Sequence, residues 1–255
     1  MVTIDPLQST IYYSQFTIYC LLFTIHCSLF TIYCLLFTVY YLLFTVYHSK
    51  TMHISEGVLS PAVLIGGAAL AAAGVAVGMK NLEQKEIPTI GILSAAFFVA
   101  SLIHVPAGPV SAHLILNGLV GLILGWKAFP AILVGLALQA LLFQFGGITT
   151  LGINTLNMAL PAVICYYMFK NSLKTGMNKH TVIIFAFATG FLAVMLSGIM
   201  VGLSLYLTGE AFLPAAKLVV AAHLPVMFIE GILTTTCILF LKKVRPEILE
   251  GNHVP

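Results

Sequence analysis

The chain has 255 residues, of which 60% are hydrophobic and only 7% are charged. A soluble globular domain carries about 25% charged residues, so this composition excludes a protein whose whole surface faces water and is typical of one solvated by lipid. The basic residues behind the net charge of +3 are dispersed and not interleaved with aromatics, which argues against a nucleic acid partner. We expect a multi-pass protein of the plasma membrane, in contact with the lipid bilayer.

Residues 1–51 form a low-complexity segment. From Phe16 the chain reads FTIYCLL FTIHCSL FTIYCLL FTVYYLL FTVYHSK, one seven-residue unit in five copies. A coiled coil needs polar b, c and f positions, and a signal peptide needs a basic start and a small-residue cleavage site; the segment has neither. Since helix packing does not require identical units, we favour a mis-assigned start that translates a tandem DNA repeat and makes Met52 the true first residue. An extra hydrophobic arm is the alternative.

Beyond Met52 the chain contains seven apolar runs that approach or exceed the roughly 17–20 residues needed to cross a bilayer. They lie at about 58–79, 88–104, 112–126, 129–145, 154–170, 181–207 and 215–241. The third is short, and its start is a candidate re-entrant element. Three GxxxG pairs, which let helices approach closely, are Gly74/Gly78, Gly121/Gly125 and Gly198/Gly202. The predicted fold class is an all-α polytopic membrane helix bundle over residues 52–241, with about seven transmembrane helices.

The basic residues of this bundle are unevenly distributed between the two sets of turns. The turns after the first, third, fifth and seventh runs contain Lys80, Lys85, Lys127, Lys170, Lys174, Lys179, Lys242, Lys243 and Arg245, whereas the opposite set contains only Lys217. By the positive-inside rule the lysine-rich set is cytoplasmic. We therefore expect Met52 outside and a cytoplasmic basic tail over residues 242–255. Most of the remaining polar residues then gather at the outer face.

The pair Met52-His53 gains chemical meaning if Met52 is the first residue. Its α-amine, the His53 amide nitrogen and the His53 imidazole can then chelate one metal ion in fused rings. One further imidazole completes a square-planar set of four nitrogens, a geometry typical of Ni(II) or Cu(II), and imidazole also suits Co(II). The amide must lose its proton to bind, so affinity is expected to fall at low pH.

Four stretches of the chain resemble a known family. They are MHISEGVLSP at 52–61, GPVSAHLILNGLVGLILG at 108–125, GINTLNMALPA at 152–162 and AHLPVMFIEGILT at 222–234. In this order they resemble the CbiM/NikM family, the substrate-binding membrane subunits of energy-coupling-factor transporters for cobalt and nickel. The resemblance covers about 52–241.

The resemblance implies a metal site and a set of partners. The family binds its ion through the terminal amine, the amide and imidazole of the second residue, and a histidine before the third span, positions that match Met52, His53 and His113. Expected partners are a transmembrane coupling subunit, cytoplasmic ATPase subunits and a small accessory membrane subunit. Co(II) or Ni(II) is the transported substrate, and no organic cofactor is expected. The 51-residue extension departs from the family, because it would place the Met52 amine in a peptide bond.

Six other polar residues are candidates for supporting roles. They are His104, Asn117, Asn154, Asn157, His223 and Glu230. His104 ends the second predicted span, where an interfacial role and a role behind the metal ligands are equally open, and direct binding to the ion is less favoured. His223 lies in the outer part of the last span, and a satisfied core histidine is the preferred interpretation.

Glu230 follows His223 by seven residues, about two helical turns, and so lies on nearly the same helix face. An ionised acid at the bilayer centre costs about 2.5–3.5 kcal/mol on insertion scales, so Glu230 is expected to face protein or water, with structural support preferred over ligation. Asn117, Asn154 and Asn157 can orient a ligand imidazole or bridge helices. The sequence leaves both roles open.

Two other functional classes compete with metal capture. An intramembrane metalloprotease would need HExxH or a similar motif, which the sequence lacks. A stand-alone secondary transporter would show internal repeats with broken helices. The chain lacks the phosphate-binding motif GxxxxGK[ST], so we expect partner subunits to hydrolyse ATP.

We expect a transport subunit and not an enzyme. We prefer cobalt, which would feed cobalamin synthesis, because of the overall appearance of the 108–125 and 222–234 motifs. Nickel remains the alternative, since a strict square plane favours it.

Overall fold

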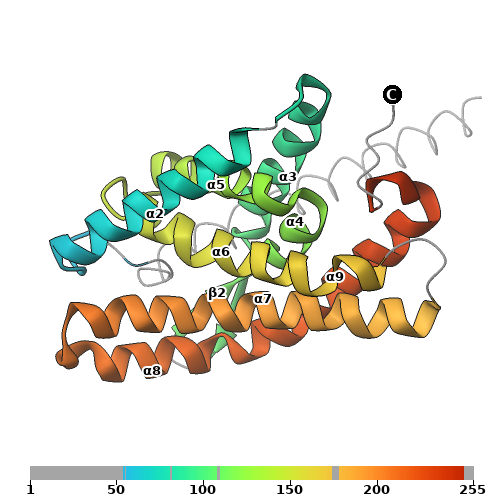
Figure 1. Ribbon diagram of the computed structural model, residues 1–255. Coiled ribbons are helices and arrows are strands. Elements are labelled where there is room, and N and C mark those ends of the chain that lie inside the picture. The colour runs from blue at the N-terminus through green and yellow to red at the C-terminus, as the bar shows by residue number, and fades with distance from the viewer. Residues whose placement is uncertain (1–53, 55, 81, 108–109, 174–177, 250–255) are drawn as a thin grey trace, which may run out of the picture. The chain divides into compact units, whose positions relative to one another are not determined.

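The computed structural model describes residues 54, 56–80, 82–107, 110–173 and 178–249, and helices make up most of this part of the chain (Figure 1). The α-helices are α2 (Pro61–Lys80), α3 (Ile87–Ala100), α4 (Asn117–Leu124), α5 (Ala128–Phe143), α6 (Leu151–Phe169), α7 (Lys179–Thr208), α8 (Leu213–Ala222) and α9 (Leu224–Val244). Short 3-10 turns are η1 (Gln84–Glu86), η2 (Gly125–Lys127), η3 (Lys170–Leu173), η4 (Glu210–Phe212) and η5 (Pro246–Ile248). The two strands are β1 (His104–Ala107) and β2 (Val110–His113).

Five helical segments in the described part of the chain are long and apolar enough to cross a membrane. They are Pro61–Lys80, Asn117–Phe143, Leu151–Ser172, Lys179–Thr208 and Glu210–Val244. Large apolar side chains such as Ile65 and Ile92 are 70% and 69% exposed, as expected where lipid is the solvent. The molecule is therefore a polytopic membrane helix bundle, while the count of seven spans and the orientation remain predictions.

The predicted third and fourth spans form one helical segment with a break at Gly125. This residue has φ +55°, a left-handed value that glycine adopts without strain, and it ends the eight-residue α4. The turn η2 follows, and α5 then continues to Phe143. The predicted helix over 112–126 is wrong at its start, because the chain up to His113 is a strand and Leu116 has φ +54°.

A two-stranded antiparallel ribbon, β1–β2, departs from the all-α prediction. Its register pairs His104 with His113 and Ala107 with Val110. The predicted second span included His104, but α3 ends at Ala100. Pro106 explains the difference, since proline disfavours helical backbone at the residue before it and has no N–H to donate within a helix.

The predicted last span, 215–241, is two helices with a break at His223. Pro225 has no N–H, and its ring clashes with the carbonyl of the residue four positions earlier, so α8 cannot continue unbroken into α9. α7 packs along both helices, and the antiparallel pairing of α7 with α8 is visible in Figure 1. The break lets α9 leave the direction of α8 while both remain packed on α7.

α6 lies at the centre of the packing, with α2, α4, α5 and α7 against it. Small residues permit close approaches: a Cβ on Gly121 of α4 would lie 2.3 Å from the Ala162 carbonyl oxygen of α6, and a Cβ on Gly74 of α2 would lie 2.4 Å from the Phe129 ring of α5. The Gly198/Gly202 pair is looser, with its nearest neighbours at 3.6 and 3.4 Å. The GxxxG pairs are packing features, most tightly so on α2 and α4.

Candidate metal centre

Two buried imidazoles face one another at the open end of the β1–β2 ribbon. His104 and His113 are paired in the register, their ring centroids lie 6.3 Å apart, and the rings are inclined at 74°. They are only 5% and 3% exposed. The ribbon thus brings together a predicted ligand, His113, and a histidine for which the sequence left two roles open.

Hydrogen bonds to backbone carbonyls define which ring nitrogen of each histidine can bind a metal. His113 Nδ1 lies 2.6 Å from the Leu114 carbonyl oxygen, and His104 Nδ1 lies 3.0 Å from that of Leu102. A carbonyl only accepts, so Nδ1 carries the proton in both rings and the lone pair is on Nε2. Metal-binding histidines characteristically donate their other ring nitrogen in this way.

Burial also keeps His104 in the form that a metal would need. Removal from water lowers the pKa of His104 below its ordinary value of 6.5, and the hydrogen bond to Leu102 offsets part of that decrease. Only the neutral imidazole binds a metal ion.

The segment just after His53 is held against the α5–α6 loop and the start of α6. The Ile54 carbonyl accepts from Asn154 Nδ2 at 3.4 Å, and Glu56 N donates to the Gly146 carbonyl at 3.2 Å. The Glu56 carboxylate accepts from Thr149 N at 3.1 Å. Asn154 therefore contacts the chain next to the predicted ligands. Met52 and His53 themselves lie outside the described residues.

The ribbon contacts the same α5–α6 loop. The ring of Phe145 lies 6.1 Å from that of His104, centroid to centroid. Ile54, Glu56 and the His104–His113 pair therefore gather at one end of the bundle, although about 50 residues separate Ile54 from His104 in the chain. Across the described residues, no group of three or more His, Cys, Asp or Glu side chains comes together.

Glu230 supports the turn that follows His113. Its Oε1 accepts from Ile115 N at 2.5 Å and from Leu116 N at 2.8 Å, and the side chain is 0% exposed. Leu116 has the left-handed φ noted above, and α4 begins at the next residue. The acid faces protein, and among the described residues its contacts are with the His113 loop and not with His113.

The remaining candidates lie in the packing between helices. Asn117 Nδ2 donates to the Met158 carbonyl at 3.1 Å and to Ser197 Oγ at 2.8 Å, which ties α4 to α6 and α7. Asn157 Nδ2 donates to Ser204 Oγ at 3.2 Å, also between α6 and α7. These contacts favour the bridging role for both amides.

His223 has the contacts of a satisfied core histidine. Its Nδ1 lies 2.7 Å from the Val219 carbonyl oxygen, and a Cβ on Gly198 of α7 would be 3.6 Å from its ring. Glu230 contacts α7 through its backbone, since its carbonyl packs on Gly190, whereas its side chain accepts hydrogen bonds from Ile115 and Leu116.

Gln139 and Glu86 are buried polar side chains that the sequence patterns did not single out. Gln139 of α5 is 0% exposed, and neither of its amide atoms has a partner among the described residues. Glu86 is 3% exposed and pairs with Lys127. A polar residue inside an apolar run was the available signal for Gln139, since such residues face the interior of a bundle.

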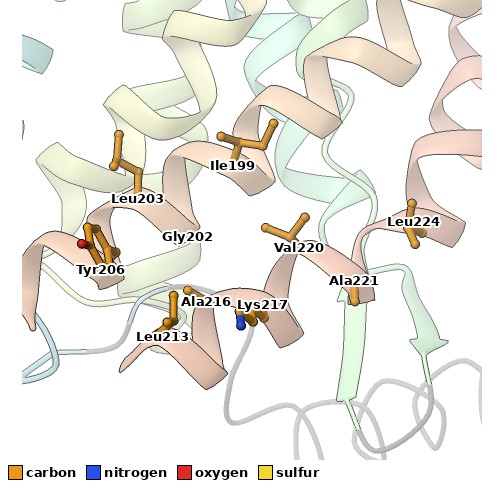
Figure 2. A pocket seen from close by; sticks show the side chains of 10 residues that line it. All are labelled: Ile199, Gly202, Leu203, Tyr206, Leu213, Ala216, Lys217, Val220, Ala221 and Leu224. Atoms are coloured by element: carbon orange, nitrogen blue, oxygen red, sulfur yellow. The ribbon is translucent and has the colours of Figure 1, made fainter. Parts of the chain in front are cut away.

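A groove between α7 and α8 has a volume of about 610 Å³ (Figure 2). The described residues that line it are apolar apart from the Tyr206 hydroxyl and Lys217, and none of them carries an imidazole, carboxylate or thiol. Neither a lysine nor a tyrosine in an apolar wall is a preferred ligand for cobalt or nickel. The groove is therefore not a candidate metal centre.

Residues 53–248 match the CbiM family, described as the cobalt uptake substrate-specific transmembrane region. A putative metal transport protein of Haemophilus influenzae is 42% identical over 203 residues, which cover 79% of this chain and 98% of that protein. The cobalt transport protein CbiM of Sorangium cellulosum is 30% identical, over 80% of this chain and 96% of its own. A putative fused nickel transport protein NikMN of Archaeoglobus fulgidus is 27% identical, over 80% of this chain and 70% of its own.

The fold is similar to solved structures as well. The crystal structure of a truncated transition metal transporter has a TM-score of 0.62 and 28% sequence identity, and the match covers 76% of this chain and 99% of that one. A second transition metal transporter gives the same TM-score with 29% identity.

Proposed function

This chain belongs to the CbiM family of membrane proteins for cobalt or nickel transport, and on that premise we propose that it is the substrate-capture subunit of an ATP-driven importer. It takes a Co(II) or Ni(II) ion at the outer face of the membrane and passes it to partners. Those partners are a transmembrane coupling subunit, cytoplasmic ATPase subunits and a small accessory membrane subunit. The chain's lack of a phosphate-binding loop supports this division of labour.

The proposed ligands are the Met52 amine, the His53 amide and imidazole nitrogens, and the His113 imidazole. One observation carries this assignment: Glu56 and the ribbon that contains His113 both contact the α5–α6 loop, and Ile54 contacts the start of α6 beside it. The Nδ1 hydrogen bond of His113 directs Nε2 toward ligation. Four nitrogen donors, one of them a deprotonated amide, form a square plane that suits Ni(II) and serves Co(II).

The ligand set requires a free amine, so the functional protein begins at Met52 in this proposal. In support, the family match begins at residue 53, and the Haemophilus relative aligns over 98% of its own length with 79% of this chain. Intact mass and N-terminal sequencing of the protein purified from its native membranes test the point. A chain that begins Met-His-Ile-Ser is expected, and a chain that retains residues 1–51 would rule out the amine as a ligand.

The proposed topology has seven spans, Met52 outside and the C-terminus in the cytoplasm. An aromatic and cationic cluster supports it: Trp126 Nε1 donates to the Tyr167 hydroxyl at 3.0 Å, and Lys170 lies 4.9 and 4.8 Å from the rings of Tyr166 and Tyr167. Aromatic residues with lysines are typical of the cytoplasmic membrane interface. Accessibility of a cysteine introduced at Lys170 to an impermeant reagent, in intact cells and in lysed cells, checks the side.

The function is tested by metal content. Wild-type protein with a free Met52 amine is expected to co-purify with about one Co(II) or Ni(II) per chain, and His113→Ala is expected to lose it. His180→Ala, which changes an exposed histidine at the start of α7, is the matched control and should retain the ion. Stoichiometric metal in the His113→Ala protein would remove the proposed site. Competition between the two ions in cells with the complete transporter tests the preference for cobalt, which nickel uptake without cobalt uptake would contradict.

The breaks at Gly125 and His223 favour a second candidate, because interrupted helices are a feature of secondary transporters. Reconstitution of the purified chain in liposomes separates the two. The importer subunit is expected to bind the ion but to accumulate none without its ATPase partners, whereas gradient-driven accumulation would support the second candidate.

A further inference from the structure

Glu230 lies inside the bundle with its carboxylate directed at backbone and not at a cation. Its Oε1 accepts from two consecutive amides, Ile115 N and Leu116 N, while its Oε2 has no partner among the described residues. A carboxylate in this position is costly unless its contacts are specific. The two residues that donate to it lie two and three positions past the proposed ligand His113, and Glu230 itself comes from α9, 115 residues beyond Ile115 in the chain.

The peptide unit between Leu114 and Ile115 connects this carboxylate to the imidazole. The described chain contains only trans peptide bonds, and in a trans unit the N–H and the C=O point in opposite directions in one plane. The Ile115 N–H donates to Glu230, so the Leu114 carbonyl is directed away from Glu230. That carbonyl accepts from His113 Nδ1 at 2.6 Å. The order of contacts is Glu230 carboxylate, Ile115 N–H, Leu114 carbonyl, His113 imidazole.

We propose that Glu230 is a positioning residue that orients the His113 imidazole through the Leu114–Ile115 peptide unit. The inference rests on the proposed function in taking His113 as a ligand, but the geometry of the relay does not depend on a bound ion. It assigns to α9 a part in the metal centre that side-chain ligation alone would not reveal.

Two physical effects follow from this arrangement. Fixing the plane of the peptide unit fixes where the Leu114 carbonyl lies, and hence the tautomer and rotation of the His113 ring. The carboxylate also polarises the peptide, because hydrogen bonds in a chain strengthen one another in a low-dielectric interior. A stronger carbonyl acceptor makes Nε2 a better electron donor to a metal ion. A contact serving only to join α9 to α4 would not require the carbonyl to face the imidazole.

The other bonds of this turn leave the peptide unit little freedom to rotate. Leu114 N donates to the Ile103 carbonyl at 3.1 Å, and Val120 N donates to the Leu116 carbonyl at 2.9 Å. Between these two points Glu230 is the acceptor, among the described residues, for the backbone N–H groups of Ile115 and Leu116. Loss of the carboxylate is therefore expected to release the Leu114–Ile115 unit specifically, with the ribbon and α4 still held at either side.

A metal-free measurement tests the relay directly. Protein labelled with ¹⁵N-histidine is examined by NMR at constant pH 8 without metal, with His113 assigned by the signal missing in His113→Ala. The wild type is expected to show one Nδ1–H tautomer with a strongly hydrogen-bonded, downfield proton. Glu230→Leu is expected to give a mixture of tautomers, and Glu230→Gln, which keeps an acceptor oxygen without the charge, to retain the tautomer with an upfield shift. Glu210→Leu, an exposed acid of η4, is the matched control.

Metal binding by the same variants provides the second readout. Substitution of groups behind a metal ligand costs about 10–100-fold in affinity, and that loss is expected for Glu230→Leu, with Glu230→Gln between it and the wild type. An unchanged His113 tautomer and proton shift in both Glu230 variants would overturn the inference, as would wild-type affinity in both. If the Glu230→Leu protein cannot be recovered in a folded form, the chemical shift of the His113 Nδ1 proton in Glu230→Gln decides whether the inference holds. Failure of the proposed function would give a different result, because His113→Ala would then leave metal binding unchanged in both the wild type and the Glu230 variants.

Discussion

Glu86 and Glu230 are two buried carboxylates with different kinds of partner. Glu86 is 3% exposed and pairs with the ammonium of Lys127, whose side chain is 22% exposed. Glu230 is 0% exposed and accepts from two backbone N–H groups. The first is at the basic end of the bundle next to η2, where a lysine stem can run toward water. The second is where the chain leaves the ribbon and enters α4.

The difference shows which donors are available to a buried carboxylate near the membrane interface and which are available inside the helix bundle. A cation is available near the interface, since lysines gather there. Deeper in the bundle, the donors are N–H groups that regular structure leaves without a partner. Leu116 is the residue that caps α4, and the first N–H groups of any helix have no intrahelical acceptor. A carboxylate at that point also meets the favourable end of the helix dipole.

Loss of the Glu230 side chain is expected to have the largest effect on stability. Glu230→Leu leaves the N–H groups of Ile115 and Leu116 buried without an acceptor, and each such group costs about 1–3 kcal/mol, or about 4 kcal/mol together. Unfolding titrations in mixed detergent–SDS micelles measure the change, with Glu210→Leu as the exposed control. A loss below about 1 kcal/mol would show that water replaces the carboxylate there.

The role of the Glu86 carboxylate is tested by removing its cationic partner, the Lys127 ammonium. Lys127→Met removes the lysine partner of this buried carboxylate, while the Glu83 N–H still donates to Oε2 at 3.0 Å. Breaking a buried pair in this way costs about 3 kcal/mol. The matched control, Lys85→Met, removes a pair with Glu83 whose side chains are 48% and 63% exposed, and exposed pairs contribute about 0–1 kcal/mol. Equal losses in the two variants would contradict the assignment of Glu86 as a buried partner.

A third prediction concerns α4, the helix that begins beside Glu230, and its close packing against the backbone of α6. A Cβ on Gly121 would lie 2.3 Å from the Ala162 carbonyl oxygen, so Gly121→Ala forces α4 and α6 apart. Overpacking of this kind costs about 1–3 kcal/mol. Gly66→Ala is the control, because a Cβ there meets nothing within 4 Å. The same unfolding titration compares them, and equal stability would show that α4 shifts freely.

The smallest effect on stability is expected from loss of a hydrogen bond between two uncharged side chains of neighbouring helices. A double-mutant cycle with Asn157→Ala and Ser204→Ala isolates the bond between the two side chains, at 3.2 Å from Nδ2 to Oγ. Such bonds in membrane proteins average about 0.6 kcal/mol. A coupling energy above about 2 kcal/mol would place this pair with the charged contacts instead.

Much of the fold was predictable because a segment that crosses a lipid bilayer must be a continuous apolar run of sufficient length. Apolar runs long enough to cross a bilayer lie where the five candidate spans are, and the family region was placed correctly from four short motifs. The errors occurred at Pro106, Leu116 and Pro225, where apolar composition continues across a backbone interruption. Hydropathy is insensitive to a missing N–H or a positive φ, so it joined or extended helices that the backbone separates.

For the candidate metal centre, the sequence by itself determined the residue types, two histidines and an acid on the last helix, while their membrane side remains a prediction. Only the tertiary structure decided that His104 faces His113, that Asn154 contacts the segment after His53, and that Glu230 binds the backbone beside His113. These contacts join residues up to 115 positions apart. Burial follows from local composition, whereas the partner of a buried polar group depends on which helices pack together and where each is interrupted.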